Sequence, residues 1–150
     1  MEELILEQNT EYIINSLDDR SLVSQRMIQM GVLPGSNIRI LRVGPLGKTV
    51  EVLIDQGESI ALRANELKAL DCKIVALPLS AVKDITKSYR IRNFLGGRGF
   101  WEKMKARNLK ISDIIKVAFN DGYQLIKKDG HKVRVGRGEA EKIILEPVES

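Results

Sequence analysis

The stretch RMIQMGVLPGSNIRI, residues 26–40, decides the fold because the chain contains a second version of it. Residues 103–117, KMKARNLKISDIIKV, align with it without a gap, so that Met27 corresponds to Met104 and Val32 to Leu109. A repeat spanning about half the chain is longer than the roughly 20 to 50 residues of a solenoid unit. The repeat therefore predicts two copies of one small domain, residues 1–77 and residues 78–150.

Bulk composition places the chain among ordinary globular proteins. It has 150 residues, of which 43% are hydrophobic and 29% are charged. No apolar run approaches the roughly 18 residues of a membrane span, and Met1-Glu2-Glu3 lacks the basic start of a secretory signal. We therefore expect no membrane span and a cytoplasmic location. Cys72 is the only cysteine, which excludes a disulfide within the chain and a thiolate metal site and favours a small buried side chain.

Charge separates the two halves. Residues 1–72 hold 7 Lys/Arg and 11 Asp/Glu, a net of 7 − 11 = −4, whereas residues 73–150 hold 17 and 9, a net of 17 − 9 = +8. A basic half joined to an acidic half is compatible with a polyanion-binding module or with electrostatic docking of the halves on each other. Charge alone leaves both interpretations open.

The first half predicts short strands around one helix. Ser21 is a good helix N-cap, and Gly31 is a good helix stop. The helix between them carries Leu22, Val23, Met27 and Met30 at near-helical spacing. Leu33-Pro34-Gly35-Ser36 reads as a type II turn, because proline fixes φ at its second position and glycine permits positive φ at its third. Strands are expected over residues 11–17, 38–43, 50–54, 59–62 and 73–77, with a helical turn over 64–70 that buries Leu67 and Leu70.

The second half repeats this order. Asn108 takes the position of Gly31, and asparagine is the next-best residue for a left-handed backbone. The segment Gly96–Gly99 is expected to be a turn that needs flexible φ angles. Strands are predicted over residues 89–94, 114–119, 123–127, 132–135 and 143–145, with a helix over 100–107 and a helical turn over 136–142. Short strands, tight turns and no βαβ alternation predict a mostly β fold with short helices, arranged as two tandem small β barrels.

Three motifs of the first half resemble the FeoA family, the accessory proteins of bacterial ferrous-iron uptake. The pattern Arg26-Met27-x-x-Met30-Gly31-x-x-Pro34-Gly35-x-x-Ile38 is similar to the signature of that family, and residues 44–47 and 60–66 match its next two landmarks. Residues 135–143 resemble a glycine-rich closing segment of some FeoA-like domains. Asn108, Ile111 and Ser112 replace the Gly, Pro and Gly of the central motif, so the second half resembles a divergent member.

The resemblance implies a barrel of the Src-homology-3-like type in each half and a role without enzymatic activity. It implies that the chain regulates or assembles a FeoB-type membrane permease from the cytosolic side, or binds a second copy of itself, with weak transition-metal (iron) binding as a further option and no certain cofactor. The residues expected to face the partner are Arg26, Met30, Gly31, Val32, Leu33, Pro34, Gly35 and Arg63. Pairing of Arg26 and Arg63 within their own domain, and burial of Val32 and Leu33 in its core, are the alternatives.

Other chemistry has weaker support in the sequence. Gly44-x-x-Gly47-Lys48-Thr49 has two residues between its glycines where a phosphate-binding loop needs four, and it lies between predicted strands. The single histidine, His131, has no serine nucleophile motif or carboxylate pair with it, so catalysis is not expected. A metal could bind through carboxylates or through His131 with Asp129 or Glu139, but their spacing is not that of a ligand set.

A rival function is nucleic-acid or other polyanion binding by the basic half. Small β barrels bind single strands through cationic grooves and exposed aromatic rings. The basic residues considered are Arg90, Arg92, Arg98, Lys103, Lys105 and Arg107, with Tyr89, Phe100 and Trp101 among them.

Overall fold

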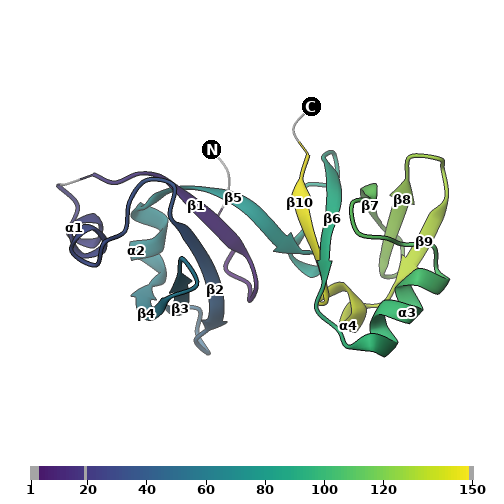
Figure 1. Ribbon diagram of the computed structural model, residues 1–150, viewed down its shortest axis with the longest axis horizontal. Helices are drawn as coiled ribbons and strands as arrows, with labels where there is room; N and C mark the ends of the chain where they lie inside the picture. The colour runs from purple at the N-terminus through teal and green to yellow at the C-terminus, as the bar shows by residue number, and fades with distance from the viewer. Residues whose placement is uncertain (1–3, 19, 149–150) are drawn as a thin grey trace. The chain divides into compact units, whose positions relative to one another are not determined.

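The computed structural model describes residues 4–18 and 20–148, and the chain divides into two compact units, Met1–Val75 and Ala76–Ser150 (Figure 1). The elements of the first unit are β1 (Glu11–Ser16), α1 (Leu22–Gln29), β2 (Asn37–Val43), β3 (Thr49–Ile54), β4 (Glu58–Arg63), α2 (Ala64–Ala69) and the start of β5 (Asp71–Pro78). The second unit continues from the end of β5 with a short 3₁₀ helix (Leu79–Ala81), β6 (Ser88–Phe94), α3 (Arg98–Ala106), β7 (Ile114–Phe119), β8 (Tyr123–Lys127), β9 (Lys132–Val135), α4 (Arg137–Ala140) and β10 (Ile143–Pro147). No described helix is long and apolar enough to cross a membrane.

Strands of the first unit lie in the order β4-β3-β2-β1-β5. The ladders β1–β2, β2–β3 and β3–β4 are antiparallel, with Ile38 opposite both Tyr12 and Ile54. Alternate residues therefore point inward, and Ile14, Ile38, Ile40 and Val52 are fully buried. Met27 of α1 and Leu67 of α2 complete this core.

Strands of the second unit repeat the pattern as β10-β6-β7-β8-β9, with the end of β5 beside β10. Ile91, Ile115, Val117 and Leu125 form its core together with Met104 of α3. Neither unit closes its barrel by strand pairing among the described residues, because β4 and β9 each have one hydrogen-bonded neighbour. The predicted fold class, mostly β with short helices in Src-homology-3-like units, is confirmed.

Several backbone hydrogen bonds of the first unit have an equivalent bond within the second unit. The N–H of Val32 donates to the Met27 carbonyl at 3.0 Å, and the N–H of Leu109 donates to the Met104 carbonyl at 2.9 Å. In this segment, the number of each residue in the second unit is 77 higher than that of its equivalent in the first unit. Further equivalent pairs are Gly35 N–H to Ile14 O and Ser112 N–H to Ile91 O, both 2.7 Å, and Ile14 N–H to Ser36 O and Ile91 N–H to Asp113 O, 3.0 and 2.9 Å.

The difference in residue number between equivalent positions changes at the turn between β2 and β3, which corresponds to the turn between β7 and β8. Ile40 lies opposite Val52, and Val117 lies opposite Leu125. The offset is thus 117 − 40 = 77 before the turn and 125 − 52 = 73 after it, so the second unit has four fewer residues in this stretch. It remains 73 at the closing helix, where the N–H groups of Arg63 and Gly136 each donate to a glutamate, Glu66 or Glu139, at 2.9 Å.

Most backbone predictions hold, with three local corrections. Leu22 does not belong to the core, because the buried stripe of α1 consists of Val23, Ser24 and Met27. Cys72 is half-buried rather than buried. Gly96, Gly97 and Gly99 do not adopt positive φ angles; Gly96 instead makes a close approach, because an added Cβ would lie 2.3 Å from the Phe100 Cβ.

Candidate functional site

The corner formed by the end of α1 and the turn after it holds most of the residues predicted to face a partner. We call residues 26–35 with Arg63 the α1 corner. Met30 caps the helix, Gly31 leaves it at φ = 86°, and Gly35 takes the left-handed position of the next turn at φ = 96°. The Ser36 N–H donates to the Leu33 carbonyl at 2.9 Å, which closes the turn as expected for type II. The sequence predicted this backbone correctly.

Side chains at the α1 corner divide between core and surface. Val32 is buried, whereas Leu33 is 66% exposed and Met30 is 39% exposed. Gly31, Pro34 and Gly35 are exposed as well. On the same helix Leu22 is 82% exposed and Ile28 is 44% exposed. The predicted pair Val32-Leu33 is therefore not one apolar tip: Val32 anchors the turn and Leu33 projects from it.

The two arginines of the α1 corner behave differently. The Arg26 guanidinium lies 3.3 Å from the Glu66 carboxylate, which also accepts the Arg63 N–H at 2.9 Å and so caps α2. Arg63 is exposed, and its guanidinium has no partner among residues 4–18 and 20–148. Arg26 thus pairs within its own domain, and Arg63 is available to a ligand.

A shallow pocket of about 210 Å³ adjoins the α1 corner. Its wall is Met30, Gly31 and Val32 on one side and the β3–β4 turn, with Ile54, Asp55 and Glu58, on the other. Asp55 and Glu58 are exposed carboxylates. The α1 corner therefore combines an exposed apolar surface with an acidic rim.

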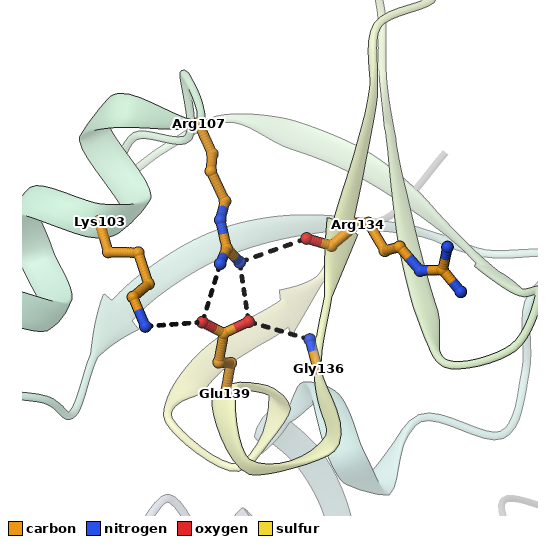
Figure 2. A network of polar contacts seen from close by, with 5 residues as sticks. All are labelled: Lys103, Arg107, Arg134, Gly136 and Glu139. Carbon is orange, nitrogen blue, oxygen red and sulfur yellow. Dashed lines mark hydrogen bonds and ion pairs between the residues drawn. The ribbon is translucent and has the colours of Figure 1, made fainter.

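The equivalent corner of the second unit carries a polar network instead, which we call the Glu139 network (Figure 2). Arg107, the residue equivalent to Met30, forms two hydrogen bonds with the Glu139 carboxylate at 2.7 and 3.0 Å, and one with the Arg134 carbonyl at 3.3 Å. Lys103, equivalent to Arg26, lies 3.4 Å from the same carboxylate. Glu139 also accepts the Gly136 N–H and so caps α4. Arg107, Lys103 and the Gly136 N–H thus all contact one half-buried carboxylate.

These contacts keep Glu139 ionised far into the acid range. The hydrogen bonds from Arg107 are the largest cause, and they lower the pKa of the Glu139 carboxyl from its ordinary 4.5 to about 2 against the opposing effect of burial. The Gly136 N–H and Lys103 add to the lowering. Sequence reasoning missed this network because its members lie 32 residues apart; aligning the two copies through Glu66 and Glu139 is the signal that could have revealed it.

The remaining sequence candidates are scattered. His131 Nδ1 lies 3.4 Å from Asp129, both exposed, while Glu139, its other suggested neighbour, binds Arg107 and Lys103. Among the described residues no three His, Cys, Asp or Glu side chains gather as a metal site would require. The loop Gly44–Lys48 joins two strands, with the Gly44 N–H donating to the Thr49 carbonyl at 2.8 Å.

The basic and aromatic residues of the rival interpretation are largely engaged inside their own unit. Arg90 pairs with Glu146 and Arg98 with Glu102, each at 3.2 Å. Tyr89 is buried, and Trp101, 41% exposed, packs edge-on against Phe94 at 5.0 Å between ring centroids. Phe100 is half-buried, with Lys142 5.4 Å above its ring. Most of these cations and rings therefore have contacts inside their own unit.

Comparison with known proteins gives one family and several related structures. The FeoA domain model matches residues 5–73. The solution structure of an iron(II) transport protein A from Clostridium thermocellum is 28% identical, with a TM-score of 0.55 over 97% of this chain and 86% of that one. A crystal structure of an iron uptake regulatory protein (FeoA) is 20% identical over 49% of this chain and 99% of its own, with a TM-score of 0.43. An NMR structure of a Pseudomonas aeruginosa protein is 32% identical over 47% and 95%, with a TM-score of 0.35. Among curated proteins, no sequence matches the chain.

Proposed function

Because the chain belongs to the FeoA family, a non-enzymatic family of ferrous iron transport, we propose that it is an accessory protein that acts by contact with the cytosolic part of a FeoB-type permease. The contact surface is the α1 corner of the first unit. The observation that carries the proposal is the exposure of Leu33, Met30 and Ile28 on the one unit that the FeoA domain model matches.

Exposed apolar side chains that lie together on a small domain are typical of interaction sites. Leu33 is held out by a turn whose backbone is fixed on both sides, by Val32 in the core and by the Gly35 N–H on the Ile14 carbonyl at 2.7 Å. Such a preformed projection loses little conformational entropy on binding. Arg63, exposed at the start of α2, supplies a free cation for a carboxylate of the partner.

We propose further that the second unit is a divergent FeoA-like domain. The support is the set of equivalent hydrogen bonds at offsets of 77 and 73 residues, including both helix caps and the turn in which Asn108 and Ser112 replace Gly31 and Gly35. Its corner carries Arg107 where the first unit has Met30. The chain would then hold one apolar docking corner and one charged corner.

The test is binding of the full chain to the soluble cytosolic domain of the permease, measured by calorimetry at two salt concentrations. We expect binding by the wild type that survives high salt, because apolar contacts are not screened. Leu33→Ser should weaken it at least tenfold. Leu46→Ser is the matched control, since Leu46 is 80% exposed on the same unit but lies in the β2–β3 loop, and we expect it to bind like the wild type.

Equal binding by Leu33→Ser and wild type would show that the α1 corner is not the contact surface. Absence of any binding would exclude the cytosolic domain of the permease as the partner. A second copy of the chain is the other partner that the family resemblance allows, and sedimentation of the same samples detects it. The polyanion alternative predicts affinity for single-stranded nucleic acid that falls steeply with salt.

Two further parts of the proposal have their own checks. Contact with the cytosolic side requires a cytoplasmic location, which cell fractionation tests. Transition-metal binding by this chain remains a prediction of the resemblance, with iron as cargo rather than as a resident cofactor. Anaerobic titration with Fe²⁺ would measure it directly.

A further inference from the structure

Three arginines of the second unit stand where the first unit has none. Arg107 corresponds to Met30 at the offset of 77, and Arg134 and Arg137 correspond to Ala61 and Ala64 at the offset of 73. The equivalence is structural, because Ala61 lies opposite Glu51 in the β3–β4 ladder as Arg134 lies opposite Gln124 in β8–β9. The fold is therefore built in the first unit without any of these cations.

All three arginines line one hollow. It has a volume of about 600 Å³, and its wall also includes Gly136, Glu139 and Asp121. Small-molecule sites typically span about 300–1,000 Å³. Three arginines against two carboxylates give the lining a net charge of 3 − 2 = +1, and Lys103 stands beside Glu139 at 3.4 Å. The hollow is thus polar, positively charged and large enough for a small ligand.

The three guanidinium groups differ in how firmly they are held. Arg107 is committed to Glu139. The Arg134 side chain extends away from Glu139 (Figure 2) and pairs with Asp121 at 3.3 Å and with its carbonyl at 2.8 Å. Arg137 is exposed and has no side-chain partner within the described part of the chain. Arg134 and Arg137 are therefore the two groups that a ligand could engage.

The Arg134–Asp121 pair does not account for Arg134 by itself. The Asp121 side chain is 95% exposed and that of Arg134 is 67% exposed. An ion pair this open contributes little to stability. A phosphate dianion carries twice the charge of the Asp121 carboxylate and fits the two-pronged guanidinium donor, so it can displace that carboxylate.

We propose that this hollow is an oxyanion site that binds the phosphate group of a small phosphorylated molecule through Arg134 and Arg137. Arg107, locked on Glu139, forms its wall and adds positive potential. The site belongs to the second unit alone, since the first unit has Met30, Ala61 and Ala64 at these positions. It is independent of the α1 corner.

The experiment is an NMR titration of the full-length ¹⁵N-labelled chain at constant ionic strength. The probes are inorganic pyrophosphate, a nucleoside monophosphate, and a single-stranded oligonucleotide without terminal phosphates. We expect saturable shifts with the first two probes at the amides of Arg134, Gly136 and Arg137. Arg134→Ala combined with Arg137→Ala should weaken binding at least tenfold, because two charge-assisted donors are lost.

The double variant is expected to fold, since alanine occupies both equivalent positions of the first unit. If the double variant does not fold, Arg137→Ala alone replaces it as the test variant, because this substitution removes a side chain that has no partner within the described part of the chain. Lys116→Ala with Lys128→Ala is the matched control, because it removes the same charge from exposed positions that do not line the hollow. Non-saturating shifts, or equal loss in variant and control, would overturn the proposal. Binding of the oligonucleotide alone would overturn it as well, in favour of a backbone phosphodiester.

Discussion

The two corners have the same backbone and opposite chemistry. Met30 and Arg107 both cap a helix, at φ, ψ of −85°, 2° and −86°, 6°, and both helices lead into the same left-handed turn. One corner exposes Met30 beside Leu33, and the other folds Arg107 onto Glu139. The two units thus keep the same backbone and equivalent buried residues at this corner, while the exposed side chains differ.

The largest expected effect tests whether those underlying positions are equivalent. Met27 and Met104 are both fully buried and occupy the same place under their corners. Met27→Ala and Met104→Ala should each destabilise their own unit by about 2–5 kcal/mol, because each leaves a cavity in a packed core. Urea unfolding followed by fluorescence of Trp101, the only tryptophan and part of α3, reports on the second unit.

Amide hydrogen exchange reports on each unit separately and serves as the control for that fluorescence. Met104→Ala should lower protection in β6–β10, and Met27→Ala in β1–β4. A cost below about 1 kcal/mol in one unit only would break the equivalence of the two cores.

Much of this framework was readable from the sequence. Gly31, Pro34 and Gly35 predicted the helix end and the turn because few other residues fit those backbone angles. The alignment of Met27 with Met104 predicted the repeat. These signals are local, so they need no knowledge of distant contacts.

What escaped prediction depends on contacts distant in sequence. The exposure of Leu22 was missed because Leu22, Val23, Met27 and Met30 allow two possible apolar faces, and only packing against the sheet selects Val23 and Met27. The Glu139 network joins α3 to α4 across 32 residues. The sequence predicts a need for flexible φ angles at Gly96, but the structure shows a steric need instead, because Phe100 leaves no space for a side chain there.

The second prediction compares the carboxylates that cap α2 and α4. Glu139→Gln should destabilise the second unit by about 1–3 kcal/mol, because it leaves Arg107 and Lys103 without their partly buried counter-charge while keeping a cap acceptor for the Gly136 N–H. Glu66→Gln, the matched control, should cost less than about 1 kcal/mol, since Arg26 is half exposed. Chemical denaturation of both variants measures the difference, and equal costs would contradict the special role of the network.

Acid should bring the stability of the wild type closer to that of Glu139→Gln. The pKa of the Glu139 carboxyl is lowered from 4.5 to about 2 in the folded protein, so its ionised form stabilises the fold fully above pH 4.5. That contribution is lost as the pH falls from 4.5 toward 2. The stability gap between wild type and Glu139→Gln should therefore narrow over this range, and a constant gap would mean that the carboxylate charge is not what stabilises the corner.

The smallest expected effect exchanges the left-handed residues of the two turns. Ser112 adopts φ = 79° where the first unit has Gly35 at φ = 96°. Ser112→Gly should stabilise the second unit by up to about 1 kcal/mol, because a Cβ in this region is strained, less the entropy that glycine adds to the unfolded chain. Gly35→Ser should cost a similar amount by torsion alone, since nothing lies within 4 Å of the added Cβ. Thermal unfolding of this reciprocal pair measures both signs. If both substitutions destabilise, the two turns are not interchangeable, and the divergence at Ser112 has been absorbed by its surroundings.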